Sequence, residues 1–115
     1  MAISEFEIKR LEKYVGEYVR KKRPPQVVRH QLDLAFRIVN QSFEIYEIWP
    51  KYQNPEETTE RSVAKATYVK SKKIWKLYWK RSDLRWHSYK QFPTSKSLEE
   101  ILEVIDKDTN GCFWG

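Results

Sequence analysis

The sequence holds few of the residues that crosslink small secreted proteins or form tight turns. Its 115 residues include one cysteine, Cys112, so an internal disulfide is excluded and the chain suits a reducing compartment. Only three glycines are present, so other residue types must form most turns. No stretch approaches the roughly 18 consecutive apolar residues of a membrane span, and the N-terminus does not resemble a signal peptide. These absences predict a cytoplasmic protein with no membrane partner.

Residue patterns that carry enzyme chemistry are also scarce. The two histidines, His30 and His87, form no Cys/His cluster with metal-ligand spacing, and the chain has no phosphate-binding glycine loop or nucleophile elbow. No signature pairs Cys112 with a base, so we interpret it as a small buried hydrophobe. We expect no metal, no cofactor and no catalytic residue. A small-molecule or enzymatic pocket near Glu47 or His87 stays as an alternative.

The composition predicts one folded domain that spans residues 1–115. A hydrophobic fraction of 40% with 15% aromatic residues is too high for a disordered chain. Residues 4–7 form a capping box that begins an amphipathic helix, which should end before Pro24. A second capping box at residues 97–100 begins a C-terminal helix, for which Asn110-Gly111 is a good stop. The apolar tail that follows should pack on the domain.

Five stretches between the two helices alternate apolar and polar residues, as antiparallel strands do. They cover residues 31–39, 42–49, 62–70, 73–80 and 84–90. Strands that cluster in the sequence, with helices at both ends, predict an α+β fold. We expect an N-terminal helix, a five-stranded antiparallel meander and a C-terminal helix, with both helices packed on the same face of the sheet.

The first hairpin has a register that two features support. A turn at Asn40-Gln41 places Phe36 opposite Ile45 on the apolar face. The same turn places Arg37 opposite Glu44 on the other face, where they form a favourable ion pair.

Glu47 is unusual because this register puts it on the apolar face, opposite Leu34. A buried carboxylate must be paired, hydrogen-bonded or protonated. The strand could end there and leave Glu47 at a wet edge, or Glu47 could be a pocket acid. Its candidate partners are Arg23, Arg29 and His30.

Residues 70–90 concentrate the charge of the chain. They contain eight Lys and Arg and a single acid, a net charge of +7 against +6 for the whole protein. With turns at Ser71-Lys72 and Ser82-Asp83, strand alternation places the tryptophans of this segment in the core. Cations and smaller aromatics then gather on the outer face. The candidate binding residues there are Lys65, Lys76, Tyr78, Lys80, Arg85, His87 and Tyr89.

Three interpretations of this basic outer face are open. Cations around exposed aromatic rings are typical of surfaces that bind single-stranded nucleic acid. The face could instead contact an acidic protein or a second copy of the chain as a homodimer. It could also be an ordinary solvated sheet face, since antiparallel sheets often keep one face wet. We expect a binding module that uses this face, with nucleic acid as the named ligand class.

Distinctive pieces of sequence run almost from end to end of the chain. They are residues 4–8, 23–25, 32–34, 47–50, 64–70, 75–89 and the ending Gly-Cys-Phe-Trp-Gly at 111–115. In these pieces the chain resembles domain-of-unknown-function family 3024, whose members are small bacterial proteins. The resemblance implies a stand-alone bacterial domain. It implies no activity, so no catalytic or binding residue is taken from it.

Overall fold

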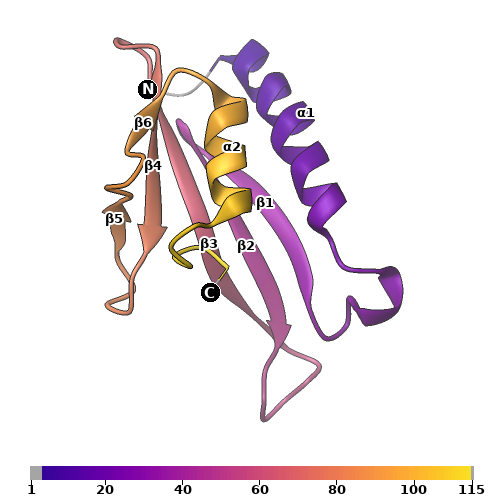
Figure 1. The fold of residues 1–115 in the computed structure, drawn as a ribbon. Coiled ribbons are helices and arrows are strands. Elements are labelled where there is room, and N and C mark those ends of the chain that lie inside the picture. Colours follow the sequence, from indigo (N-terminus) through magenta and orange to yellow (C-terminus); the bar gives the residue numbers. More distant parts are fainter. Residues whose placement is uncertain (1–3, 115) are drawn as a thin grey trace.

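Helices at the two ends of the chain enclose a run of strands in the computed structural model, which describes residues 4–114 (Figure 1). The helices are α1 (Glu5–Lys22), the short 3-10 turn η1 (Gln26–Val28) and α2 (Leu98–Lys107). The strands are β1 (Asp33–Val39), β2 (Ser42–Pro50), β3 (Thr58–Val69), β4 (Ile74–Lys80), β5 (Trp86–Ser88) and β6 (Thr94–Ser95).

The predicted capping boxes begin both helices. The Ser4 hydroxyl accepts a hydrogen bond from the Glu7 amide at 3.3 Å, and the Ser97 hydroxyl accepts one from Glu100 at 3.2 Å. The C-terminal stop of α2 differs from the prediction of Asn110-Gly111. The helix ends at Lys107, and its C-cap residue Asp108 adopts a left-handed backbone with φ 41°. Asp tolerates this conformation better than most residues.

The strands form one antiparallel sheet in the order β1-β2-β3-β4-β5, with β6 added to β4. Figure 1 shows α1 and α2 on the same side of this sheet. The predicted α+β fold, with both helices on one face, is therefore confirmed. The short strand β6 was not predicted, because two residues are too few to show alternation.

The first hairpin has the predicted register. Phe36 pairs with Ile45, and Arg37 pairs with Glu44 through an ion pair of 3.0 Å. Asn40 adopts a positive φ of 55°, as the two-residue turn requires.

The register of β5 differs from the prediction by one residue. A turn at Ser82-Asp83 would place Trp86 opposite Trp79, but Trp86 pairs with Lys80 and a five-residue loop, 81–85, joins the strands. Because strand side chains alternate, this shift moves every side chain of β5 to the opposite face. The prediction that Trp86 lies in the core is therefore wrong.

The core lies between the sheet and the two helices. Phe43 and Trp75 are buried against each other at a ring separation of 5.7 Å. The C-terminal tail also packs into this core, since Phe113 is fully buried against Tyr89 at 4.9 Å. The Asp108 carboxylate holds the tail by accepting the amide hydrogen bonds of residues 113 and 114. Gly115 lies outside the described residues.

Removal of the tail anchor tests this packing. We expect Phe113→Ala to lower the free energy of unfolding by about 3–5 kcal/mol, because it leaves a cavity in the core. The matched control Phe6→Ala removes a ring that is 76% exposed and should change stability by less than about 0.5 kcal/mol. Urea denaturation followed by tryptophan fluorescence measures both, and equal effects would show that the tail does not pack as described.

Candidate functional site

The candidate binding site is the sheet face turned away from the helices. Among residues 4–114, no helix or strand covers this face (Figure 1). On β3, β4 and β5 it carries a cluster that we call the lysine–aromatic patch. The patch consists of Lys65, Lys76, Tyr78, Lys80 and Trp86.

Tyr78 occupies the centre of the patch. Lys65 lies directly opposite it on β3, and Lys76 and Lys80 lie two residues away on either side along β4. Residues two apart along a strand share a face, so Lys76 and Lys80 lie on the same face as Tyr78 and Lys65. The predicted outer-face placement of these four residues is confirmed.

Trp86 adds a second aromatic ring to the patch. The Nζ atoms of Lys65 and Lys80 lie 5.8 and 5.3 Å from the centre of the indole ring, within the range of cation–π attraction. Lys80 Nζ also donates a hydrogen bond to the Ser62 hydroxyl at 3.4 Å. The ring is half-buried beneath the lysine side chains and keeps part of its surface open to solvent.

The two halves of the outer face differ in charge. On β1 and β2, Arg37 is neutralised by Glu44 at 3.0 Å and Glu60 at 2.6 Å. By contrast, none of the three patch lysines forms an ion pair with any residue of the described chain 4–114. Lysines without an ion-pair partner among residues 4–114 therefore lie on the half of the face that holds Tyr78 and Trp86.

The other three predicted binding residues lie away from the patch. Tyr89 is wrongly placed by the prediction, because it is 2% exposed and its hydroxyl accepts a hydrogen bond from Asn110 at 3.0 Å. His87 faces the helix side opposite Trp79, contrary to the prediction. Arg85 is exposed in the loop 81–85 rather than on a strand. The one-residue shift in β5 accounts for the wrong placement of His87 and Tyr89, and it explains why Trp86 was not predicted to belong to the site.

Glu47 is half-buried and paired, but by a different partner from those predicted. Its side chain is 13% exposed and forms an ion pair of 2.8 Å with Arg61, which lies directly opposite on β3. Trp49 Nε1 donates a second hydrogen bond to the same carboxylate at 3.3 Å. Sequence reasoning missed Arg61 because it began the third strand at residue 62, whereas β3 begins at Thr58.

The predicted partners of Glu47 are occupied elsewhere or exposed. Arg23 holds Asp33 through two hydrogen bonds of 2.7 and 2.8 Å. Arg29 donates to the Pro24 carbonyl oxygen at 3.0 Å, and His30 is exposed. The prediction that one of these three residues pairs with Glu47 is wrong.

A hollow of ≈ 320 Å³ lies beside Glu47. Its lining residues are Lys22, Pro24, Leu32, Asp33, Leu34, Glu47 and Trp114. The ionic groups of the lining already have partners, since Arg23 binds Asp33 and Asp106 binds Lys22 at 2.9 Å. The hydrogen bonds from Arg23 hold the pKa of Asp33 below its ordinary value of 3.8. These paired groups favour a role in stability over acid–base chemistry.

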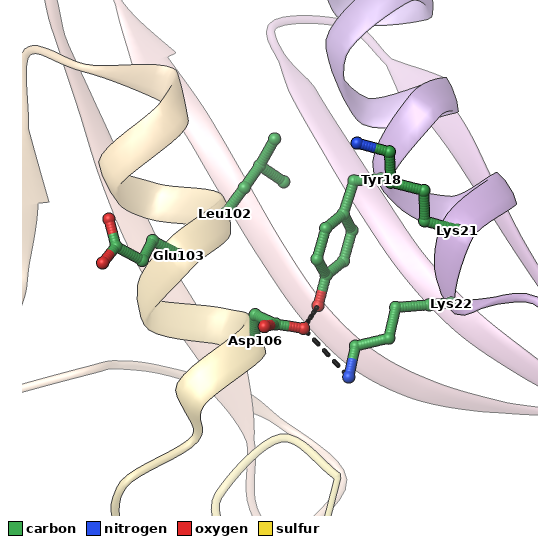
Figure 2. A pocket seen from close by; sticks show the side chains of 6 residues that line it. All are labelled: Tyr18, Lys21, Lys22, Leu102, Glu103 and Asp106. Carbon is green, nitrogen blue, oxygen red and sulfur yellow. Dashed lines mark hydrogen bonds and ion pairs between the residues drawn. The ribbon is translucent and has the colours of Figure 1, made fainter.

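A shallow groove of ≈ 290 Å³ between α1 and α2 is also lined by polar groups that pair with each other (Figure 2). Tyr18 donates a hydrogen bond to Asp106 at 3.2 Å, and Lys22 forms an ion pair with the same carboxylate. Burial and the nearby Asp106 charge raise the pKa of Tyr18, so its hydroxyl stays protonated and serves as a donor. Figure 2 shows these three side chains meeting across the groove, which ties the helices together.

Catalytic or metal-binding groupings are not evident in the described part of the chain. No group of three or more His, Cys, Asp or Glu residues within 4–114 could hold a metal ion. Burial raises the pKa of the Cys112 thiol, which makes it a weaker nucleophile at neutral pH. No helix within the same residues is long and apolar enough to cross a membrane.

The chain belongs to the family described as Domain of unknown function (DUF3024), whose model matches residues 3–115. The resemblance seen in the sequence is thus confirmed over nearly the whole chain. Comparisons with curated proteins and with solved structures found no match. The family defines the class of the protein, and its function has to be argued from the molecule itself.

The Glu47–Arg61 pair can be tested by a double-mutant cycle. Arg61→Leu should destabilise the fold by roughly 1–3 kcal/mol, because it leaves a carboxylate whose side chain is only 13% exposed without its ion-pair partner. Adding Glu47→Gln should recover most of this loss, since the neutral amide needs no counter-charge and still accepts the Trp49 hydrogen bond. Additive losses in urea denaturation would contradict the pairing.

The Arg23–Asp33 pair predicts a dependence of stability on pH. The pKa of Asp33 is lowered in the folded state, so its contribution is complete above the ordinary carboxyl pKa and is lost as pH falls through the lowered value. Asp33→Asn should therefore lose stability at neutral pH and show a flatter decline below about pH 4. Glu12→Gln, on an exposed carboxylate of α1 without an ion pair in residues 4–114, is the matched control and should keep the wild-type profile.

Proposed function

We propose that this protein is a binding module that holds single-stranded nucleic acid on the outer face of its sheet. The observation that carries the proposal is the position of Trp86. Its ring is flanked by two lysines that form no ion pair within residues 4–114, on a sheet face that no helix of that part of the chain covers. A location in the bacterial cytoplasm belongs to the same proposal and gives the module access to such ligands.

The chemistry of the patch fits this ligand class in two ways. Tyr78 and Trp86 are half-buried, so each ring is held by the sheet while part of it can stack against a base. Lys65, Lys76 and Lys80 lack acidic partners in the described chain and can neutralise phosphates. Each nucleotide of a single strand carries one phosphate charge and one planar base. The phosphates can pair with the lysines while the bases stack on the neighbouring aromatic rings.

An acidic protein or a second copy of this chain is the rival occupant of the same face. Self-association requires two copies of a positively charged patch to meet, which like-charge repulsion opposes. A protein partner leaves the aromatic rings without stacked bases. The charge and the open rings together therefore favour nucleic acid.

Titration of fluorescent single-stranded oligonucleotides at several salt concentrations tests the proposal. The logarithm of affinity should fall with the logarithm of salt at about −0.7 per phosphate neutralised. Trp86→Ala should weaken binding by about 1–3 kcal/mol through loss of a stacked base. Lys65→Gln with Lys80→Gln should reduce the salt slope by about 0.7 for each lysine removed.

The matched control is Lys9→Gln with Arg20→Gln, which removes two exposed cations from α1. This variant should bind oligonucleotides like wild type. If it loses as much affinity as the Lys65→Gln, Lys80→Gln variant, binding depends only on net charge and the patch is not the site. Sedimentation velocity separates the rival occupant. A dimer broken by Tyr78→Glu, together with oligonucleotide binding that Trp86→Ala leaves unchanged, would replace this proposal with self-association.

A further inference from the structure

A second basic hollow lies on the opposite, helix-bearing side of the β4–β5 hairpin. Its volume is ≈ 300 Å³. Its lining residues are Trp79, Arg81, His87, Ser88, Lys90 and Gln91. Figure 1 shows β5 at the edge of the sheet, to the side of α2, so the helix does not cover this end of the hairpin.

The hollow repeats the combination of groups found on the outer face. The Arg81 guanidinium lies 5.6 Å from the centre of the Trp79 ring. Lys90 is exposed, and neither Arg81 nor Lys90 forms an ion pair with a described residue. The acid in the vicinity is Asp83, which is engaged with His87 Nε2 at 2.8 Å and with the Arg85 amide at 2.9 Å. An aromatic wall with two free cations is suited to a nucleotide base and its phosphates.

Cations also connect the two faces around the end of β4. A third hollow of ≈ 310 Å³ at this end is lined by Lys80 of the outer patch and by Arg81 of the second hollow. Arg81 lines both hollows, so positive charge is continuous from the patch to the helix side. Glu60 also lines the third hollow, but Arg37 pairs with it at 2.6 Å.

We propose that a single nucleic-acid strand bound on the lysine–aromatic patch continues around the end of β4 into the hollow beside Trp79. This inference rests on the proposed function, since the patch supplies the primary contact. Arg81 and Lys90 neutralise phosphates of the continuing strand, and a base packs against Trp79. The nucleic acid then contacts both faces of the β4–β5 hairpin, and affinity depends on the length of the oligonucleotide.

A length series of single-stranded oligothymidylates from about 4 to about 16 nucleotides tests this path. Arg81→Gln with Lys90→Gln should leave binding of the shortest oligomers that occupy the patch unchanged. With the longest oligomers the same variant should reduce the salt slope by about 0.7 for each cation removed. The patch variant Lys65→Gln with Lys80→Gln should weaken binding at every length.

Three results would overturn the path. If Arg81→Gln with Lys90→Gln has no effect at any length while the patch variant weakens binding, the hollow is not used and the proposed function stands. If the hollow variant weakens all lengths equally, the hollow belongs to the primary contact and the strand does not continue into it. If wild-type protein binds no oligomer, the proposed function fails and the path fails with it. The control Lys9→Gln with Arg20→Gln, which keeps its binding at every length, shows that net charge alone does not set the result.

Discussion

The structure depends on the burial of one sheet face beneath two helices. Strand side chains alternate between faces, so the register of each hairpin decides which residues enter the core and which reach solvent. The loop 81–85, in which Leu84 adopts a positive φ of 63°, sets the register of β5 against β4. The loop turns Tyr89 into the core against Phe113 and leaves Trp86 outside among the lysines. A one-residue change there would exchange a core ring for a surface ring.

The first hairpin could be predicted from sequence because its turn and both of its faces agree. Asn40 tolerates positive φ, and the ion pair of Arg37 with Glu44 supports the same register as the apolar pairs. In the last hairpin these signals were absent. A leucine at positive φ is rare, so nothing marks Leu84 as the turn residue, and tryptophans lie on both faces of the strands. The composition of the patch was visible in the sequence, but the membership of Trp86, His87 and Tyr89 depended on this turn.

The pairing of Glu47 shows a different limit of sequence reasoning. Its place on the apolar face could be predicted from alternation. Its partner depends on two further features, the start of β3 at Thr58 and a β-bulge in β3 opposite the Ile45–Tyr46 step of β2. The bulge inserts Val63 and realigns the start of β3, which brings Arg61 opposite the carboxylate. Arg61 also donates to the Phe113 carbonyl oxygen at 3.3 Å. The Glu47 carboxylate and the C-terminal tail are therefore held by the same guanidinium.

The charge distribution is the strongest argument that the outer face has a ligand. Lys65 is a diagonal cross-strand neighbour of both Lys76 and Lys80, and the acid opposite Lys65 on β2, Glu44, forms its ion pair with Arg37 instead. The same protein pairs Arg37 with two glutamates on the adjoining half of that face, so the fold can neutralise its cations. A ligand that binds only the folded state stabilises it, and an anionic one also removes the repulsion among the lysines. Under the proposed function, the phosphates of a bound strand would supply the negative charge that these lysines lack among residues 4–114.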